Sequence, residues 1–219
     1  MPDPRRQIRA RALSIGVSTV PFAIAFGAAC TQAGMTWWEA MGFSLVVFGG
    51  SAQFAAVGVL GDGGSVTAAI LAGGLLNMRS LAFGILLAPA LKGPVWWRAL
   101  SSQWMIDEST AVAVSTDDPE LRRYGYLAGG LSVYLLWNAG TLVGALVVGE
   151  AGDLILRWGL DATIPAAFLA LLWPRLGDPA QRRAMAAGLV IAAALVPFTP
   201  PGIPIIAAAL GVLAGTVRS

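Results

Sequence analysis

The stretch Phe48-Gly-Gly-Ser-Ala-Gln-Phe54 decides how this chain folds, because it interrupts a long apolar segment. That segment runs from about Glu39 to Leu60, and a membrane-spanning helix needs about 20 apolar residues. Each of the two adjacent glycines weakens a helix by about 1 kcal/mol relative to alanine. The interruption frees backbone groups that can bind a ligand, as the broken helices of secondary transporters do. The alternative is a kink in which Ser51 and Gln53 bond to a neighbouring helix.

The composition of the whole chain identifies a membrane protein. Of its 219 residues, 57% are hydrophobic and 12% are charged, whereas soluble domains carry about 45–50% apolar and about 25% charged residues. The mean hydropathy is +0.72. So little charge cannot cover a soluble surface, and the length leaves no room for a separate catalytic domain. The formal charge of +2 therefore concerns orientation in the membrane and not nucleic acid.

Eight apolar segments predict an all-α, polytopic helical membrane protein with an interrupted second span. They cover residues 13–33, 39–60, 66–91, 100–116, 124–149, 160–174, 184–198 and 202–217. The fourth segment carries two acids at its centre, and the count is seven if it does not cross. Residues 1–12 form a basic cytoplasmic tail in this scheme, and residues 13–219 form a single transmembrane transporter domain.

The basic residues orient this scheme. If the fourth segment crosses, ten of the 14 basic residues lie on the side of the N-terminus, and positive charge marks the cytoplasmic side. Both termini are then cytoplasmic, in the inner cell membrane. Loop 61–65 is predicted to be cytoplasmic, and residues 92–99 and the proline-rich turn 197–204 are predicted to be external. The alternative for 197–204 is an unwound stretch inside one long span. The tryptophans expected at the outer boundary are Trp37, Trp38, Trp96, Trp97 and Trp158.

The residues that the chain lacks narrow its function. It has no histidine and a single cysteine, Cys30, so neither a metal site nor an internal disulfide is predicted. It has no Walker ATP-binding motif, and its only lysine is Lys92. No enzymatic activity, metal or cofactor is predicted. A secondary transporter driven by a gradient becomes the leading class of function.

Polar residues at membrane depth form the rest of the candidate site. Asn77 and Arg79 lie in the third segment, and an arginine there costs at least about 2.5–3.5 kcal/mol unless it faces protein or water. Its forked guanidinium suits a carboxylate, which belongs either to the protein or to a substrate. Asp107 and Glu108 in the fourth segment point about 100° apart on a helix, so one can pair with Arg79 while the other faces a cavity. A carboxylate released from such a pair can accept a proton.

Further features leave alternatives open. Trp104 and Trp137 lie deep in predicted spans, where they either pack or contact a substrate. Asp161 is either the cap of the sixth helix or a proton site. Glycines spaced four apart at 125–129, 140–144 and 211–215 predict faces where helices approach closely, within this chain or against a partner.

Four motifs together resemble the AzlC (YgaZ-like) family. They are Pro21-Phe-Ala-Ile-Ala-Phe-Gly27, the stretch 48–54, Asn77-x-Arg79 and Trp104-x-x-Asp107-Glu108. The resemblance covers nearly the whole chain. It implies a cytoplasmic-membrane protein that exports branched-chain amino acids together with a small hydrophobic AzlD-like (YgaH-like) subunit. It carries no settled set of binding residues.

The residues and the resemblance predict the same kind of site. A zwitterionic amino acid needs a cationic partner, an anionic partner and an apolar pocket. The substrate-binding candidates are Gly49, Gly50, Ser51, Gln53, Phe54, Asn77 and Arg79, and the proton-coupling candidates are Asp107 and Glu108. Two other functions remain: a membrane scaffold or receptor subunit without transport activity, and a channel for small neutral solutes.

Overall fold

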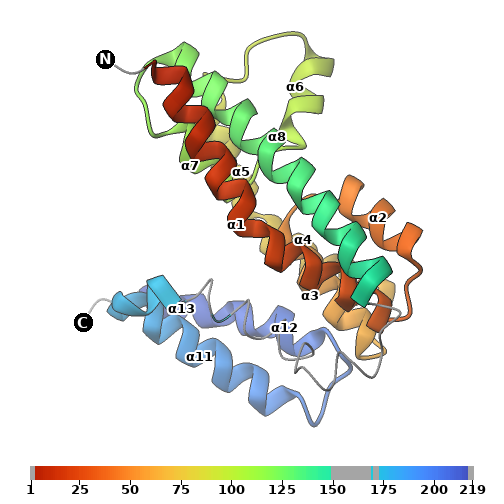
Figure 1. The fold of residues 1–219 in the computed structure, drawn as a ribbon. Helices are drawn as coiled ribbons and strands as arrows, with labels where there is room; N and C mark the ends of the chain where they lie inside the picture. The colour runs from red at the N-terminus through yellow and green to blue at the C-terminus, as the bar shows by residue number, and fades with distance from the viewer. Residues whose placement is uncertain (1–2, 149–168, 170–172, 217–219) are drawn as a thin grey trace.

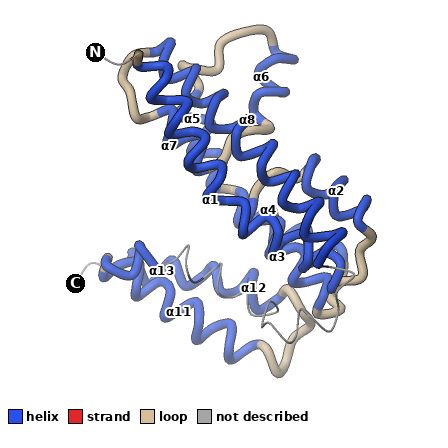
Figure 2. The backbone as a smooth tube through the Cα atoms, viewed as in Figure 1, coloured by secondary structure: helices blue, strands red, loops and turns tan. Residues whose placement is uncertain are grey.

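The structure is a computed structural model that describes residues 3–148, 169 and 173–216. Every regular element in that part of the chain is helical (Figure 2). The helices are α1 (Pro4–Gln32), α2 (Trp37–Val46), α3 (Gly50–Gly61), α4 (Val66–Asn77), α5 (Arg79–Leu87), α6 (Val95–Ser102), α7 (Asp107–Ala113), α8 (Pro119–Val143), α11 (Pro179–Leu195), α12 (Ile203–Ala208) and α13 (Val212–Thr216), with short π and 3-10 turns at Gly144–Val148, Trp173–Gly177 and Ala209–Gly211. The sixth apolar segment, apart from its last residues, and Asp161 lie outside the described residues.

Three stretches of the described chain are long and apolar enough to cross a membrane: Pro4–Gln32, Val66–Leu87 and Pro119–Val147. Two apolar helical stretches are shorter, Gly50–Gly61 and Ile203–Thr216. The chain is therefore an all-α membrane protein, but these helices do not amount to the eight spans that the sequence predicts. α1 also runs through residue 12, so the basic tail of the predicted scheme is the first part of a helix.

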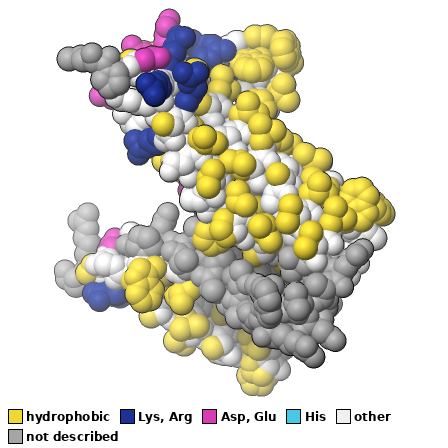
Figure 3. Space-filling view, viewed as in Figure 1, with side chains coloured by type: hydrophobic (Ala, Val, Ile, Leu, Met, Phe, Trp, Pro, Cys, Tyr) yellow, Lys and Arg dark blue, Asp and Glu magenta, His cyan; other side chains and the backbone are white. Residues whose placement is uncertain are grey.

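α1 and α8 lie side by side and run in the same direction (Figure 1). The Arg5 guanidinium lies over the Tyr124 ring near the start of both helices, 5.5 Å from its centroid. Farther along, a Cβ built on Gly27 would lie 2.1 Å from the Thr141 carbonyl oxygen. We call the end where both helices begin the basic end, because Arg5, Arg6, Arg9, Arg11, Arg122 and Arg123 belong to it, and the opposite end the far end. Figure 3 shows most of the visible charged side chains at the basic end, a smaller charged group at the lower left, and hydrophobic side chains along the face between them.

α2 and α3 form a re-entrant pair that starts and finishes at the far end. α2 begins shortly after α1 ends, and near its own end the Leu45 carbonyl accepts a hydrogen bond from the Tyr134 hydroxyl at 3.0 Å. Tyr134 lies halfway along α8, so α2 ends at the centre of the molecule. After the break at residues 47–49, α3 runs back, and a Cβ on Gly61 would lie 3.4 Å from the Ala33 Cβ. The interruption predicted at Gly49-Gly50 is present, and there the chain reverses.

α6 and α7 form a second re-entrant pair, which starts and finishes at the basic end. The Ser101 carbonyl near the end of α6 accepts a hydrogen bond from the Tyr126 hydroxyl. Residues 103–106 then reach the centre, where the Trp104 and Tyr134 rings are 6.4 Å apart. α7 returns, and just beyond its end the Thr116 carbonyl accepts a hydrogen bond from Arg122 at the basic end.

The two re-entrant pairs correct the predicted topology: residues 39–60 and 100–116 do not cross. Loop 61–65 lies at the far end, where a Cβ on Gly64 would come 3.1 Å from the carbonyl oxygen of Pro201 in the turn after α11. The predicted scheme put loop 61–65 and that turn on opposite sides. The segment between α5 and α6, with Lys92, lies at the basic end (Figure 1). The cause of the error is physical: hydropathy measures apolar length, and a reversal at a polar break leaves that length unchanged.

In the corrected arrangement, the basic residues are also separated more clearly from the far end. Arg98 and the Trp96-Trp97 pair belong to α6, so the two tryptophans lie on the opposite side from Trp37 and Trp38 instead of sharing a boundary with them. The far-end segment 33–65 contains no lysine or arginine. Basic residues therefore collect at one end among these helices, as the positive-inside rule describes.

The three small-residue faces all pack within this chain. They meet neighbouring backbones as follows: Gly125 and Gly129 contact α7, Gly140 and Gly144 contact α1, and Gly211 and Gly215 contact α11. A Cβ on Gly144 would lie 2.0 Å from the Ile24 carbonyl oxygen, so only glycine fits there. Such contacts bring helix backbones together without a hydrophobic driving force, as in other membrane proteins.

Candidate functional site

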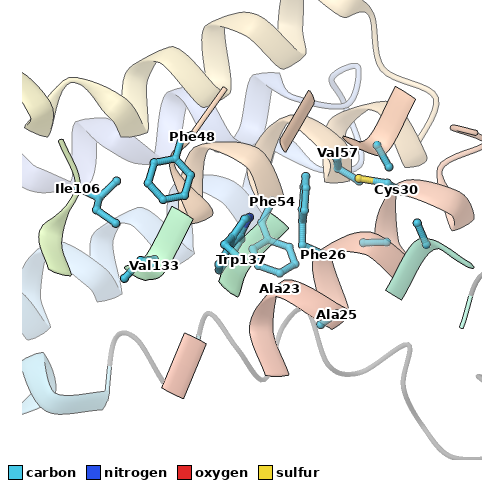
Figure 4. Packing of buried hydrophobic residues seen from close by; sticks show 13 residues of the cluster. Ala23, Ala25, Phe26, Cys30, Phe48, Phe54, Val57, Ile106, Val133 and Trp137 are labelled. Carbon is cyan, nitrogen blue, oxygen red and sulfur yellow. The ribbon is translucent and has the colours of Figure 1, made fainter. Parts of the chain in front are cut away.

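A cavity of about 200 Å³ lies where the two re-entrant pairs meet α1, α5 and α8. Its apolar wall consists of Phe22, Phe48, Phe54, Ile106, Val133 and Trp137, and its polar wall of Ser18, Thr19, Gly50, Ser51, Arg79, Asp107 and Glu108. Figure 4 shows Phe48, Ile106 and Val133 near one another, with Phe54 and Trp137 beside Phe26. Pockets for drug-sized ligands measure about 300–1,000 Å³, so this cavity suits a smaller solute.

An ion pair forms part of the polar wall of the cavity. Arg79 Nη1 lies 2.8 Å from Asp107 Oδ2, and the two side chains are 38% and 37% exposed. Arg79 begins α5 directly after the bend at Met78, and Asp107 begins α7. The sequence left open whether Arg79 pairs with a carboxylate of the protein or of a substrate, and in the structure it pairs with a carboxylate of the protein.

Glu108 faces the same cavity without such a partner. It lines the wall next to Asp107, and no ion pair joins it to any of the described residues. The two adjacent acids are therefore divided as their helical spacing predicts: one is paired, and the other faces the cavity. The cavity holds one carboxylate that remains available for a proton or a cationic group.

Both returning helices begin at the cavity, but their first turns differ. α7 carries Asp107 and Glu108 there, and the Ser109 hydroxyl accepts a hydrogen bond from the Ile106 amide at 3.1 Å. α3 has Gly49 at its cap position, no capping side chain and no acid in its first turn. The positive end of α7 is thus neutralised by its own carboxylates, whereas that of α3 is not.

Hydrogen bonds from a side chain stabilise the interruption between α2 and α3. The Gln103 side-chain amide donates to the carbonyls of Leu45 at 3.0 Å and Val46 at 2.9 Å. These carbonyls end α2 and have no helical partner. Because Gln103 belongs to the link between α6 and α7, it joins one re-entrant pair to the other. This role could not be predicted from the sequence, because an isolated glutamine forms no motif.

The structure brings most, but not all, of the candidate residues to the cavity. Those that line it are Gly50, Ser51, Phe54, Arg79, Asp107 and Glu108. Asn77 instead accepts a hydrogen bond from Ser80 at 3.2 Å and lines a separate groove with Gln103. Gln53 is fully buried but does not line the cavity, and neither its side-chain oxygen nor its side-chain nitrogen has a hydrogen-bond partner among the described residues. Gly49 stands beside Asn77, whose Oδ1 would lie 3.1 Å from a Cβ there.

Trp137 is the main cavity residue that the candidate set omitted. Its side chain is 6% exposed and meets the Phe54 ring edge-on, with the centroids 6.3 Å apart. The sequence offered packing and substrate contact as alternatives for Trp137, and the structure supports packing while also placing it in the wall. Ser18 and Thr19 were missed as well, because they lie in a long apolar helix without a motif around them.

Comparison with known proteins now places the chain. The family model described as AzlC protein matches residues 14–150, a range that contains every residue lining the cavity. The chain belongs to the AzlC family.

Two curated relatives of this AzlC protein are membrane proteins. An uncharacterized membrane protein of Archaeoglobus fulgidus is 33% identical over 201 residues, covering 90% of this chain and 86% of the relative. The inner membrane protein YgaZ of Escherichia coli is 26% identical over 216 residues, covering 94% of this chain and 83% of the relative. No solved structure matches the chain. These relatives indicate a transport-type membrane protein.

The AzlC match also separates the site from the last helices. It ends before α11, α12 and α13, which join the rest of the described chain at the far end. There, a Cβ on Gly202 would lie 2.9 Å from the Ala68 Cβ in α4. The AzlC part of the chain therefore contains both re-entrant pairs and the complete cavity wall.

Proposed function

We propose that this AzlC protein is a secondary transporter that exports branched-chain amino acids such as valine, leucine and isoleucine. We further propose that export is coupled to protons and that a small AzlD-like hydrophobic subunit takes part. The observation that carries the proposal is the central cavity, which combines an apolar wall with a carboxylate that has no ion-pair partner among the described residues.

The wall chemistry favours an amino acid with an aliphatic side chain. Phe22, Phe54 and Val133 offer apolar contact, and Glu108 offers an anionic partner for an ammonium group. An apolar pocket distinguishes solutes that differ by one methylene by only about 1–3 kcal/mol. Overlapping use of valine, leucine and isoleucine follows.

Glu108 also supplies a simple means of coupling. A carboxylate neutralises either a proton or an ammonium group, and the two compete for the same oxygens. A proton that enters can thus displace the amino acid that leaves. The neighbouring Asp107 stays paired with Arg79, so a single group carries the exchange.

The test is counterflow of radiolabelled valine into proteoliposomes, with the protein alone and with the small subunit, in the presence and absence of a pH gradient. We expect labelled valine to accumulate against its gradient and the pH gradient to increase that accumulation. Failure to accumulate any branched-chain amino acid, even with the subunit present, would favour the scaffold function and overturn the exporter.

A variant pair sharpens the coupling role. Glu108→Gln keeps an oxygen that accepts from the ammonium group but cannot bind a proton, so exchange should persist while pH-driven accumulation is lost. Glu120→Gln removes an exposed carboxylate from the first turn of α8 and should transport as the wild type does. If Glu108→Gln retains its full dependence on the pH gradient, the proton is carried elsewhere.

A further inference from the structure

We infer that the substrate's carboxylate binds at the N-terminus of α3, between Ser51 and the indole N–H of Trp137, and not on Arg79. The inference rests on the proposed function, because it states how an amino acid is held in the same cavity. It divides the cavity into an end made of hydrogen-bond donors and an end made of acceptors.

The first step is the free end of α3. The first amides of a helix lack partners within the helix, and the helix dipole makes this end favourable for an anion. In α3, a helix of 12 residues, no side chain caps these amides and no acid stands in the first turn. Because Gly50 and Ser51 line the cavity, these donors are at its wall. Helix N-termini of this kind bind carboxylates and phosphates in many proteins.

The second step is a pair of buried donors beside that end. Ser51 Oγ and Trp137 Nε1 are both buried, and neither has a hydrogen-bond partner among the described residues. Buried polar groups almost always have one. Both residues line the cavity, and we therefore place the acceptor that these two groups lack inside it. A carboxylate has two oxygens and can accept from both groups and from the α3 amides together.

The third step is the contact between Gly50 and Trp137. A Cβ on Gly50 would lie 3.0 Å from the edge of the Trp137 ring. The glycine therefore allows the indole to lie directly against the first turn of α3. α8 and the first turn of α3 are brought together in this way, through the six-membered ring of the indole.

Arg79 is the competing site for the substrate's carboxylate, but it already has a partner. The guanidinium of Arg79 is already bonded to Asp107 at 2.8 Å. A substrate carboxylate on Arg79 would leave Asp107 unpaired next to Glu108, where two unneutralised acids repel each other. With the carboxylate at α3 instead, the substrate's ammonium group is left for Glu108, which lines the same cavity.

The experiment compares two ligands on the purified full-length protein by titration calorimetry. Leucine carries the carboxylate, and 3-methylbutylamine is the same molecule without it. Trp137→Phe removes the indole N–H and keeps a ring, and Ser51→Ala removes the hydroxyl. Each substitution should weaken leucine binding about tenfold, the loss typical of one hydrogen bond to a charged group, and should leave amine binding within about twofold.

Trp104→Phe is the matched control. Trp104 also has a buried indole nitrogen without a partner among the described residues, but it does not line the cavity, so both ligands should bind as they do to the wild type. The assignment is overturned if Trp137→Phe and Ser51→Ala weaken leucine and the amine equally or affect neither. It is also overturned if Arg79→Gln weakens leucine selectively. If the wild-type protein binds neither ligand, the proposed function itself fails.

Discussion

The pairs α2–α3 and α6–α7 have the same shape and opposite chemistry. Each enters from one end of the α1–α8 pair, breaks at the centre and returns, so that α3 and α7 both begin at the cavity. α3 begins with Gly50-Ser51 and has no cap or acid, whereas α7 begins with Asp107-Glu108. One helix end therefore presents donors and the other presents carboxylates.

This difference shows how a chain with little charge can bind a zwitterion. A bare helix end supplies partial positive charge without a cationic side chain, and insertion of such a side chain into the membrane is costly. Two carboxylates supply the opposite charge, and Arg79 balances one of them. The described cavity wall thus contains one positively charged side chain, that of Arg79, and this charge neutralises Asp107 of the same wall.

The largest effect tests whether the α2–α3 pair is re-entrant. Single cysteines replacing Arg6, Asp62 and Lys92 would be labelled from each side of the membrane with an impermeant thiol reagent, while native Cys30 is buried. We expect residues 6 and 92 to label from one side and residue 62 from the other, in an all-or-none pattern. Eight crossing spans predict the reverse, with residue 62 on the side of residue 6, and that result would remove the comparison altogether.

Much of the site could be predicted from sequence, because its residues break the apolar pattern. Gly50 and Ser51 interrupt one segment, and Arg79, Asp107 and Glu108 place charge where it is costly. Each of these residues is costly in an apolar helix unless it has polar surroundings, and all of them line the cavity. The interruption followed from such reasoning, and the pairing of Arg79 with one of the two acids was one of the two alternatives that it left open.

The reversals could not be predicted in the same way, because direction depends on contacts distant in sequence. Gln103 binds the end of α2 although it lies 57 and 58 residues from the two carbonyls in the sequence. Trp137 reaches the site through its fit against Gly50. A local signal did exist for helix starts: Asp-Pro pairs at 3–4, 118–119 and 178–179 each open a helix, with the aspartate as cap.

The next effect concerns the α7 side of the comparison. Arg79→Asp would place three acids together and should lower both the melting temperature and transport. Breaking a fully buried ion pair costs about 3–5 kcal/mol, and the loss here should be smaller because the side chains are 38% and 37% exposed. Adding Asp107→Arg restores a pair in the opposite order and should recover the melting temperature, measured by thermal unfolding in detergent.

The control for that swap is the ion pair at the basic end. Arg122 lies 3.4 Å from Asp117, whose side chain is fully exposed, so Asp117→Asn should change the melting temperature little. If the double variant at 79 and 107 is as unstable as Arg79→Asp alone, the pair does not stabilise the meeting point of α5 and α7.

The smallest effect concerns the bonds that join the two pairs. Gln103→Ala removes the two hydrogen bonds to the Leu45 and Val46 carbonyls, which are exposed, and each such bond contributes about 0.5–1.5 kcal/mol. Tyr134→Phe removes one bond to Leu45 and should cost less, about 0.5–1.5 kcal/mol. Because Gln103 and Tyr134 share the Leu45 carbonyl, the double variant should lose more stability than the sum of the single losses. Gln7→Ala, on the exposed side of α1, should unfold at the wild-type temperature. Strict additivity would mean that Gln103 and Tyr134 hold the end of α2 independently of each other.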